Sequence, residues 1–198
     1  MSMIQPFTIG NYLFIEVVSS VPPYFIYRTV DLVEEKFHQF KAYKKLNPDY
    51  ADRKSFQRNL EREVGVLKLL RNPHIPNYFE HGDSGENSYL VSEYIWGKSL
   101  LEVLRELQKI NKILSAPFAV TIANEVLQCL KYSHSLRTPL VPNGLAHFNL
   151  NPQNIIISYS GKVFVLGYGQ KPLMITTKNL EKVDFRRISY LSPEQVTG

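Results

Sequence analysis

The first half of the chain alternates between short apolar segments typical of strands and one apolar stripe typical of a helix. Aromatic and β-branched residues concentrate in five segments that predict strands, at residues 12–18, 24–30, 37–46, 75–80 and 88–94. Between the third and fourth segments, apolar residues recur every three or four positions from Phe56 to Leu70, as on one face of a helix. Pro22 and Pro23 separate the first two strands and predict a hairpin with a stiff tip.

The second half of the chain has mainly helical periodicity. A helix with one apolar face is expected after Gly97. Ser115 and Pro117 mark the start of a second, longer helix. The apolar stripe of that helix is Ala119, Ile122, Ala123, Val126 and Leu130. Two short apolar strands are expected at 155–157 and 163–166, with loops between and after them. A mostly-β half followed by a mostly-α half predicts an α+β fold.

Length and composition narrow the class of protein. The chain has 198 residues, enough for one domain or two small lobes, and its 44% hydrophobic content excludes a disordered or fibrous protein. The net charge of +5 falls short of a dedicated nucleic-acid binder. The basic stretch after residue 40 is expected to form a solvated face, in preference to a surface for an acidic partner or nucleic acid. Its members are Lys41, Lys44, Lys45, Arg53, Lys54, Arg58 and Arg62.

The single cysteine and the N-terminal residues indicate the cellular compartment in which we expect the protein. Cys129 has no partner for an internal disulfide, so we expect a reducing compartment and a small buried side chain. No apolar run reaches the length of a membrane span, and the first residues lack the pattern of a signal peptide. These features predict a cytoplasmic location without a membrane contact in this chain.

Five motifs follow one another in a fixed order along these elements. Residues 41–44 read Lys-Ala-Tyr-Lys on a strand, and Glu63 lies on the next helix. Residues 147–154 read His-Phe-Asn-Leu-Asn-Pro-Gln-Asn, 167–169 read Gly-Tyr-Gly, and 190–195 read Tyr-Leu-Ser-Pro-Glu-Gln. In this order and context, the motifs resemble those of the protein kinase superfamily, and the last one resembles its bacterial Ser/Thr branch.

The resemblance implies a two-lobed fold. It implies a five-stranded antiparallel N-terminal lobe with one helix at 9–95, after an extension at 1–8. A partial, mostly helical C-terminal lobe follows at 96–198. In active kinases further helices complete this lobe, so the chain is a piece of a longer protein, or a partner or second copy covers the exposed surface.

The resemblance also implies a nucleotide site. Lys44 matches the lysine that holds phosphates and pairs with the helix glutamate, here Glu63. An equally open interpretation is that this ion pair only fixes the helix. The other positions that match nucleotide-binding positions of the family are Ile26, Ala42, Ser92, Glu93, Ile95, Asn154 and Ile156.

Several positions depart from the family's pattern. Asn149 replaces the catalytic aspartate, Phe148 the arginine before it, and Asn151 the loop lysine. Gly167 replaces the aspartate that holds magnesium, and the stretch 19–24 contains no glycine to cover a phosphate. Arg186 and Arg187 stand where the family has Gly-Thr. His147 is expected to be a core histidine bonded to the backbone.

These departures predict a pseudokinase: a scaffold or protein-interaction module in signalling that is not an enzyme, with no metal and no catalytic residues. The alternatives are a sensor that binds ATP or ADP without magnesium, or a residual Ser/Thr protein kinase. A protein partner or self-association is expected, without nucleic acid or membrane. Another kinase could phosphorylate Thr176, Thr177, Ser189 or Tyr190, although exposed hydroxyls are the simpler interpretation.

Overall fold

The computed structural model describes residues 2–20, 24–33, 39–46, 53–82, 88–170, 189–193 and 195. Contacts between residues divide the chain into two compact units. The N-terminal unit comprises Met1–Leu69 and Pro76–Ile95, and the C-terminal unit comprises Leu70–Ile75 and Trp96–Gly198. Each unit has its own sheet, so each is described by itself.

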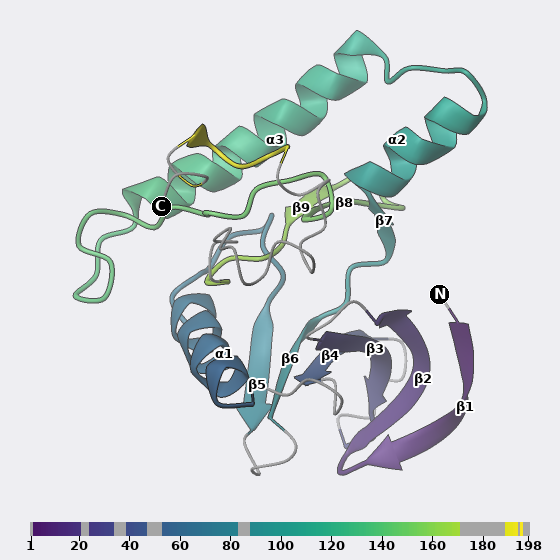
Figure 1. Ribbon diagram of the computed structural model, residues 1–198, viewed down its shortest axis with the longest axis vertical. Coiled ribbons are helices and arrows are strands. Elements are labelled where there is room, and N and C mark those ends of the chain that lie inside the picture. Colours follow the sequence, from purple (N-terminus) through teal and green to yellow (C-terminus); the bar gives the residue numbers. More distant parts are fainter. Residues whose placement is uncertain are drawn as a thin grey trace. The chain divides into compact units, whose positions relative to one another are not determined.

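An antiparallel sheet and one helix form the N-terminal unit (Figure 1). Its strands are β1 (Ser2–Ile9), β2 (Tyr12–Ser19), β3 (Tyr24–Asp31), β4 (Phe40–Leu46), β5 (Tyr78–Gly82) and β6 (Tyr89–Glu93). The helix is α1 (Arg53–Leu67). The strand order is β1-β2-β3-β4-β6-β5.

Within the described residues this sheet has six strands, so the expected number of five is wrong. The additional strand, β1, comes from the segment that was expected to be an extension, and it pairs antiparallel with β2. The register of this pair shifts between Met3 and Phe7, the interval that contains Pro6. A proline is tolerated at a bulge of an edge strand because its missing N–H is not needed there.

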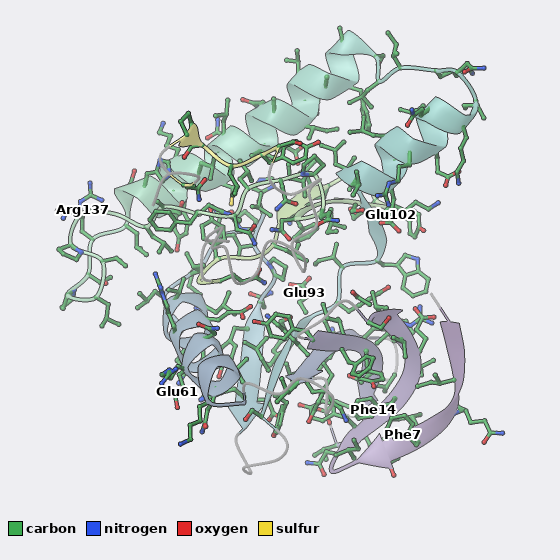
Figure 2. The ribbon with its side chains drawn as sticks, in the orientation of Figure 1. Phe7, Phe14, Glu61, Glu93, Glu102 and Arg137 are labelled. Carbon is green, nitrogen blue, oxygen red and sulfur yellow. The ribbon has the colours of Figure 1, made fainter. Side chains whose placement is uncertain are left out.

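The two faces of the sheet have different cores. On the α1 side, Leu46 and Leu90 pack with Leu60 and Val64 of the helix. On the opposite side the packing is aromatic; the buried members are Tyr12, Phe14, Tyr43 and Val91. Figure 2 shows Phe7 of β1 next to Phe14 of β2, with stacked rings whose centroids are 4.8 Å apart. The sheet is therefore covered on both sides, by a helix and by its own aromatic side chains.

The C-terminal unit contains a small sheet and two helices. Its elements are β7 (Gly97–Ser99), α2 (Leu100–Lys109), α3 (Ala116–Ser135), β8 (Ile155–Ser158) and β9 (Val163–Val165), and the sheet order is β7-β8-β9. The helix expected directly after Gly97 begins at Leu100, because 97–99 pairs with β8. Ser99 then caps α2: its Oγ accepts from the N–H of Glu102, whose carboxylate accepts from the N–H of Ser99.

The buried side of α3 differs by part of a turn from the predicted stripe. Its buried residues are Ile122, Val126, Cys129 and Ser133, whereas Ala123 of the predicted stripe is exposed. Ser133 and Cys129 can be buried in this core because the hydroxyl of Tyr168 contacts both side chains. The Tyr168 hydroxyl donates to Oγ of Ser133 at 3.1 Å and lies 3.5 Å from Sγ of Cys129.

The two units together give the α+β class that the sequence predicts, with an antiparallel N-terminal sheet and a helical C-terminal part. In the part of the chain that the structure describes, no helix has the length and apolar character needed to cross a membrane.

Candidate functional site

The predicted site residues fall into two groups, one in each unit. The N-terminal group is Ile26, Ala42, Lys44, Glu63, Ser92, Glu93 and Ile95, and the C-terminal group is Phe148, Asn149, Asn151, Asn154, Ile156 and Gly167. The structure brings together the members of each group to different degrees.

Strand register places four members of the N-terminal group on one face of the sheet. Ile26 is directly opposite Lys44 in the β3–β4 pair, and Ala42 is opposite Ser92 in the β4–β6 pair. Residues that lie opposite each other share a face, and so do alternate residues of one strand. This is the face that packs on α1, which is why Lys44 can reach Glu63.

Glu93 and Ile95 are placed differently. Glu93 follows Ser92 in β6, so its side chain projects to the opposite face. Its Oε2 accepts hydrogen bonds from the backbone N–H and Nδ2 of Asn77, at 3.1 and 2.9 Å. Ile95 follows the strand and is half-buried. These bonds fix the end of β6 to the residue before β5.

Lys44 and Glu63 form a buried ion pair between β4 and α1. The Lys44 ammonium donates to both carboxylate oxygens of Glu63, at 2.9 and 2.6 Å. Burial lowers the pKa of Lys44, but the negative charge of Glu63 outweighs it, and the net pKa lies above the ordinary value. The lysine therefore stays protonated and is a fixed positive charge in the N-terminal unit.

Tyr24 covers this lysine. The centroid of the Tyr24 ring lies 3.8 Å from Nζ of Lys44, a close cation–π contact. Tyr24 is the last residue of the stretch that matches the family's glycine-rich loop. Pro22 and Pro23, on which the predicted stiff tip depends, lie outside the described residues.

In the C-terminal unit, several side-chain amides form hydrogen bonds with the side chain and the backbone carbonyl of Asn149. Nδ2 of Asn149 donates to Oε1 of Gln170 at 3.0 Å. The backbone carbonyl of Asn149 accepts from Nδ2 of Asn151 at 3.0 Å and from Nδ2 of Asn154 at 2.7 Å. All these side chains are neutral. Sequence reasoning missed Gln170, and the only signal was its position directly after the Gly-Tyr-Gly motif.

His147 is built into the core beside this cluster, as expected. Its Nε2 donates to the carbonyl of Leu166 at 2.9 Å, and its Nδ1 accepts from the N–H of Asn149 at 3.2 Å. The His147 ring packs edge-on to Tyr168, with centroids 4.3 Å apart. Burial lowers the pKa of His147 to about 4, so the ring is neutral at physiological pH.

Phe148 lies in the same loop and has a partly exposed side chain. It has a positive φ of 59°. Its carbonyl accepts from Nε2 of Gln195 at 2.8 Å, which connects the loop to the end of the described chain. Ile156 is half-buried in β8, opposite Phe164.

Position 167 suits a glycine, because its φ is positive and the side chain of Asn154 lies close to it. Its φ is +92°, and a Cβ at this position would lie 2.9 Å from Nδ2 of Asn154. The family's magnesium is held here by an aspartate, and magnesium prefers carboxylate oxygens. A glycine offers no side-chain ligand, and the described residues contain no group of three His, Cys, Asp or Glu that could hold a metal ion. The residues at this position therefore do not fit a protein-bound magnesium ion.

Other predictions have mixed outcomes. Lys41 is wrongly assigned to a solvated face: it is buried and paired with Asp31 at 2.8 Å. Lys44 is likewise buried, whereas the helix cations with described side chains are exposed, namely Lys54, Arg58 and Arg62. Ser189 and Tyr190 are exposed. The predictions about Thr176, Thr177, Arg186 and Arg187 lie outside the described residues.

Comparison with known proteins shows the family. The profile of the protein kinase domain matches residues 28–198. Serine/threonine-protein kinase PrkC of Bacillus subtilis is 26% identical over 190 residues, covering 96% of this chain and 27% of PrkC. A probable serine/threonine-protein kinase PknB of Lactococcus lactis is 30% identical over 139 residues, covering 70% of this chain and 20% of PknB.

Solved structures agree at the level of the fold. The PknI kinase domain of Mycobacterium tuberculosis superposes with a TM-score of 0.66 at 20% identity, covering 92% of this chain and 68% of that structure. The chain spans about a fifth to a quarter of the length of the bacterial curated relatives it matches.

These findings decide two of the predictions. The prediction that the chain is not an enzyme is wrong, because its relatives carry the names of Ser/Thr protein kinases and the matching family is one of enzymes. The prediction of the family and of its kinase-like α+β fold is confirmed. The chain belongs to the protein kinase family, on its bacterial Ser/Thr branch.

Proposed function

We propose that this domain binds an adenine nucleotide and acts in protein phosphorylation as a Ser/Thr kinase-type domain. The observation that carries the proposal is the buried ion pair of Lys44 and Glu63, at 2.6 and 2.9 Å. In the family, this lysine holds the nucleotide phosphates. Ile26 and Ala42 lie on the same face of the sheet as Lys44, which suits an apolar purine next to the charge.

The binding that we propose does not require magnesium held by the protein. Gly167 supplies no ligand, so the cation that we propose for the phosphates is Lys44, once the Tyr24 ring leaves its ammonium. A lysine ammonium binds phosphate as a compact point charge. If Lys44 binds the phosphates without a protein-bound metal ion, a chelator should leave nucleotide binding unchanged.

Phosphoryl transfer is a property of the named relatives, and it belongs to the proposal for this chain. The family's base accepts a hydroxyl proton, whereas the amide of Asn149 can only accept or donate a hydrogen bond. Asn149 already donates to Gln170, which fixes its orientation. We therefore expect transfer to be slow, and we expect Asn149→Asp to increase it.

Thermal unfolding with ATP, with magnesium and with EDTA, tests the binding. A ligand that binds only the native state stabilises it by about 2.7 kcal/mol at one hundred times its Kd. We expect a rise in Tm in both buffers. The rise should be absent in the double variant Lys44→Met/Glu63→Leu, which leaves neither charge buried alone. It should persist in Lys45→Met, because Lys45 lies on the opposite face of β4.

Transfer of labelled phosphate to the chain itself and to a general substrate protein tests the catalytic part. Phosphate transfer that occurs in the wild-type chain and disappears in Lys44→Met/Glu63→Leu supports the proposal. Absence of any Tm shift at millimolar ATP in the folded wild-type chain would overturn the binding. A protein partner or self-association stays a prediction.

A further inference from the structure

Tyr24 contacts Lys44 because of the register of two strands. In the β3–β4 pair, Tyr24 is opposite Leu46 and Ile26 is opposite Lys44. Tyr24 and Lys44 are therefore diagonal neighbours on the α1 side of the sheet, a spacing that an aromatic side chain can bridge. The ring uses this spacing, with its centroid 3.8 Å from the ammonium nitrogen.

The apolar core on the α1 side of the sheet supports Tyr24. The Tyr24 side chain packs against the cluster of Leu46, Leu60, Val64 and Leu90. A ring supported in this way has fewer alternative positions than one in solvent. Its contact with a buried ammonium is also stronger than at an exposed site, because water does not compete for the cation.

The contact affects one kind of ligand group more than another. An ammonium has three N–H donors, and Lys44 directs hydrogen bonds at both oxygens of Glu63 while the Tyr24 ring covers it. A phosphate binds an ammonium through short, charge-assisted hydrogen bonds, so it needs the position that the ring occupies. An uncharged purine makes no such demand on Lys44.

We propose that Tyr24 sets the ligand class of the N-terminal unit: it selects uncharged purine compounds over their polyphosphates until its ring leaves Lys44. This inference rests on the proposed function, because it concerns the same adenine ligands. It assigns Tyr24 a role in specificity and makes the affinity for a triphosphate depend on the position of one side chain.

Isothermal titration of the full chain with adenosine and with ATP, both in EDTA, tests the inference. Tyr24→Val removes the ring and keeps a residue suited to a strand. We expect the ratio of ATP affinity to adenosine affinity to rise about thirtyfold, which corresponds to the roughly 2 kcal/mol of one desolvated cation–π contact. Tyr24→Phe keeps the ring and should behave as wild type. Phe25→Val is the matched control, because Phe25 is opposite Lys45 on the other face.

An unchanged ratio in Tyr24→Val, or an equal rise in Phe25→Val, would overturn the inference. A second measurement needs no nucleotide: the rate at which an N-hydroxysuccinimide ester acylates Lys44, followed by peptide mass spectrometry with exposed Lys109 as the internal standard. We expect acylation several-fold faster in Tyr24→Val than in wild type or Tyr24→Phe. Equal acylation rates in Tyr24→Val and wild type would contradict the proposal that the Tyr24 ring covers Lys44. If neither adenosine nor ATP binds any variant, the proposed function fails, and the acylation rates still decide whether Tyr24 covers Lys44.

Discussion

The side-chain amide of Asn154 lies so close to Gly167 that a Cβ at residue 167 would be 2.9 Å from Nδ2 of Asn154. The same Nδ2 donates to the carbonyl of Asn149 at 2.7 Å, so it cannot move without weakening that hydrogen bond. The glycine and the asparagine therefore depend on each other.

From this relationship we predict that Gly167→Ala lowers the free energy of unfolding by about 2–3 kcal/mol. About 1–2 kcal/mol comes from the positive φ and about 1 kcal/mol from the displaced hydrogen bond. Urea unfolding measures the loss. Gly161→Ala is the matched control, because Gly161 also has a positive φ of 85° but has nothing within 4 Å of a Cβ. Equal losses in the two variants would contradict the role of Asn154.

The ion pair of Lys44 and Glu63 predicts strong coupling between two substitutions. Either Glu63→Leu or Lys44→Met leaves one charge buried alone, and we expect each to cost about 3–5 kcal/mol. The double variant Lys44→Met/Glu63→Leu removes both charges and should be more stable than either single variant. Glu61→Gln, at an exposed position of α1 labelled in Figure 2, should change stability by less than about 0.5 kcal/mol. Additive losses in the double variant would disprove the coupling.

The buried neutral ring of His147 predicts a dependence of stability on pH. The pKa is about 4 in the folded chain, below the ordinary value of 6.5, so the unfolded chain binds more protons between these values. The stabilisation is complete above pH 6.5 and is lost as the pH falls towards 4, by up to about 3 kcal/mol. Urea titrations across this range measure it, and His147→Gln should flatten the curve. A variant with an unchanged pH profile would show that another group titrates.

The environment of Cys129 predicts an inert thiol. The side chain is fully buried, and burial raises its pKa, which lowers the fraction of reactive thiolate. We expect iodoacetamide to modify the native chain at a negligible rate and the urea-unfolded chain rapidly. Ser135→Cys supplies an exposed cysteine on the same helix as the positive control. Rapid modification of native Cys129 would mean that α3 opens readily.

Local patterns predict much of this fold because they report which side of an element is buried. The strands at 12–18 and 24–30 follow from their aromatic and β-branched residues, and the helix after Ser115 follows from its apolar stripe. β1 could not be predicted in this way, because Pro6 is unfavourable in a regular strand and only the bulge opposite β2 accommodates it.

The sequence predicted the positions of the site and two of its contacts, the Lys44–Glu63 pair and the bond of His147 to the backbone. The other contacts depend on the fold. The motif order identified Lys44 and Glu63, but the contact of Tyr24 with Lys44 depends on the register of β3 and β4. The burial of Lys41 depends on Asp31, which belongs to the neighbouring strand. Gln170 becomes a partner of Asn149 only through the fold of the loop, over 21 residues of sequence separation.

The distribution of aromatic residues gives each unit its own optical reporter. The single tryptophan, Trp96, belongs to the C-terminal unit and lies edge-on to Tyr159. The N-terminal unit contains Tyr43 and Tyr89 with stacked rings, 4.8 Å apart and 14° from parallel. Fluorescence excited at the tryptophan thus follows the C-terminal unit. The near-ultraviolet circular dichroism of the tyrosines is weighted towards the N-terminal unit, which holds eight of the twelve tyrosines. Coincident denaturation curves from these two signals would show that the units unfold as a single cooperative system, and separated curves would give each unit its own midpoint.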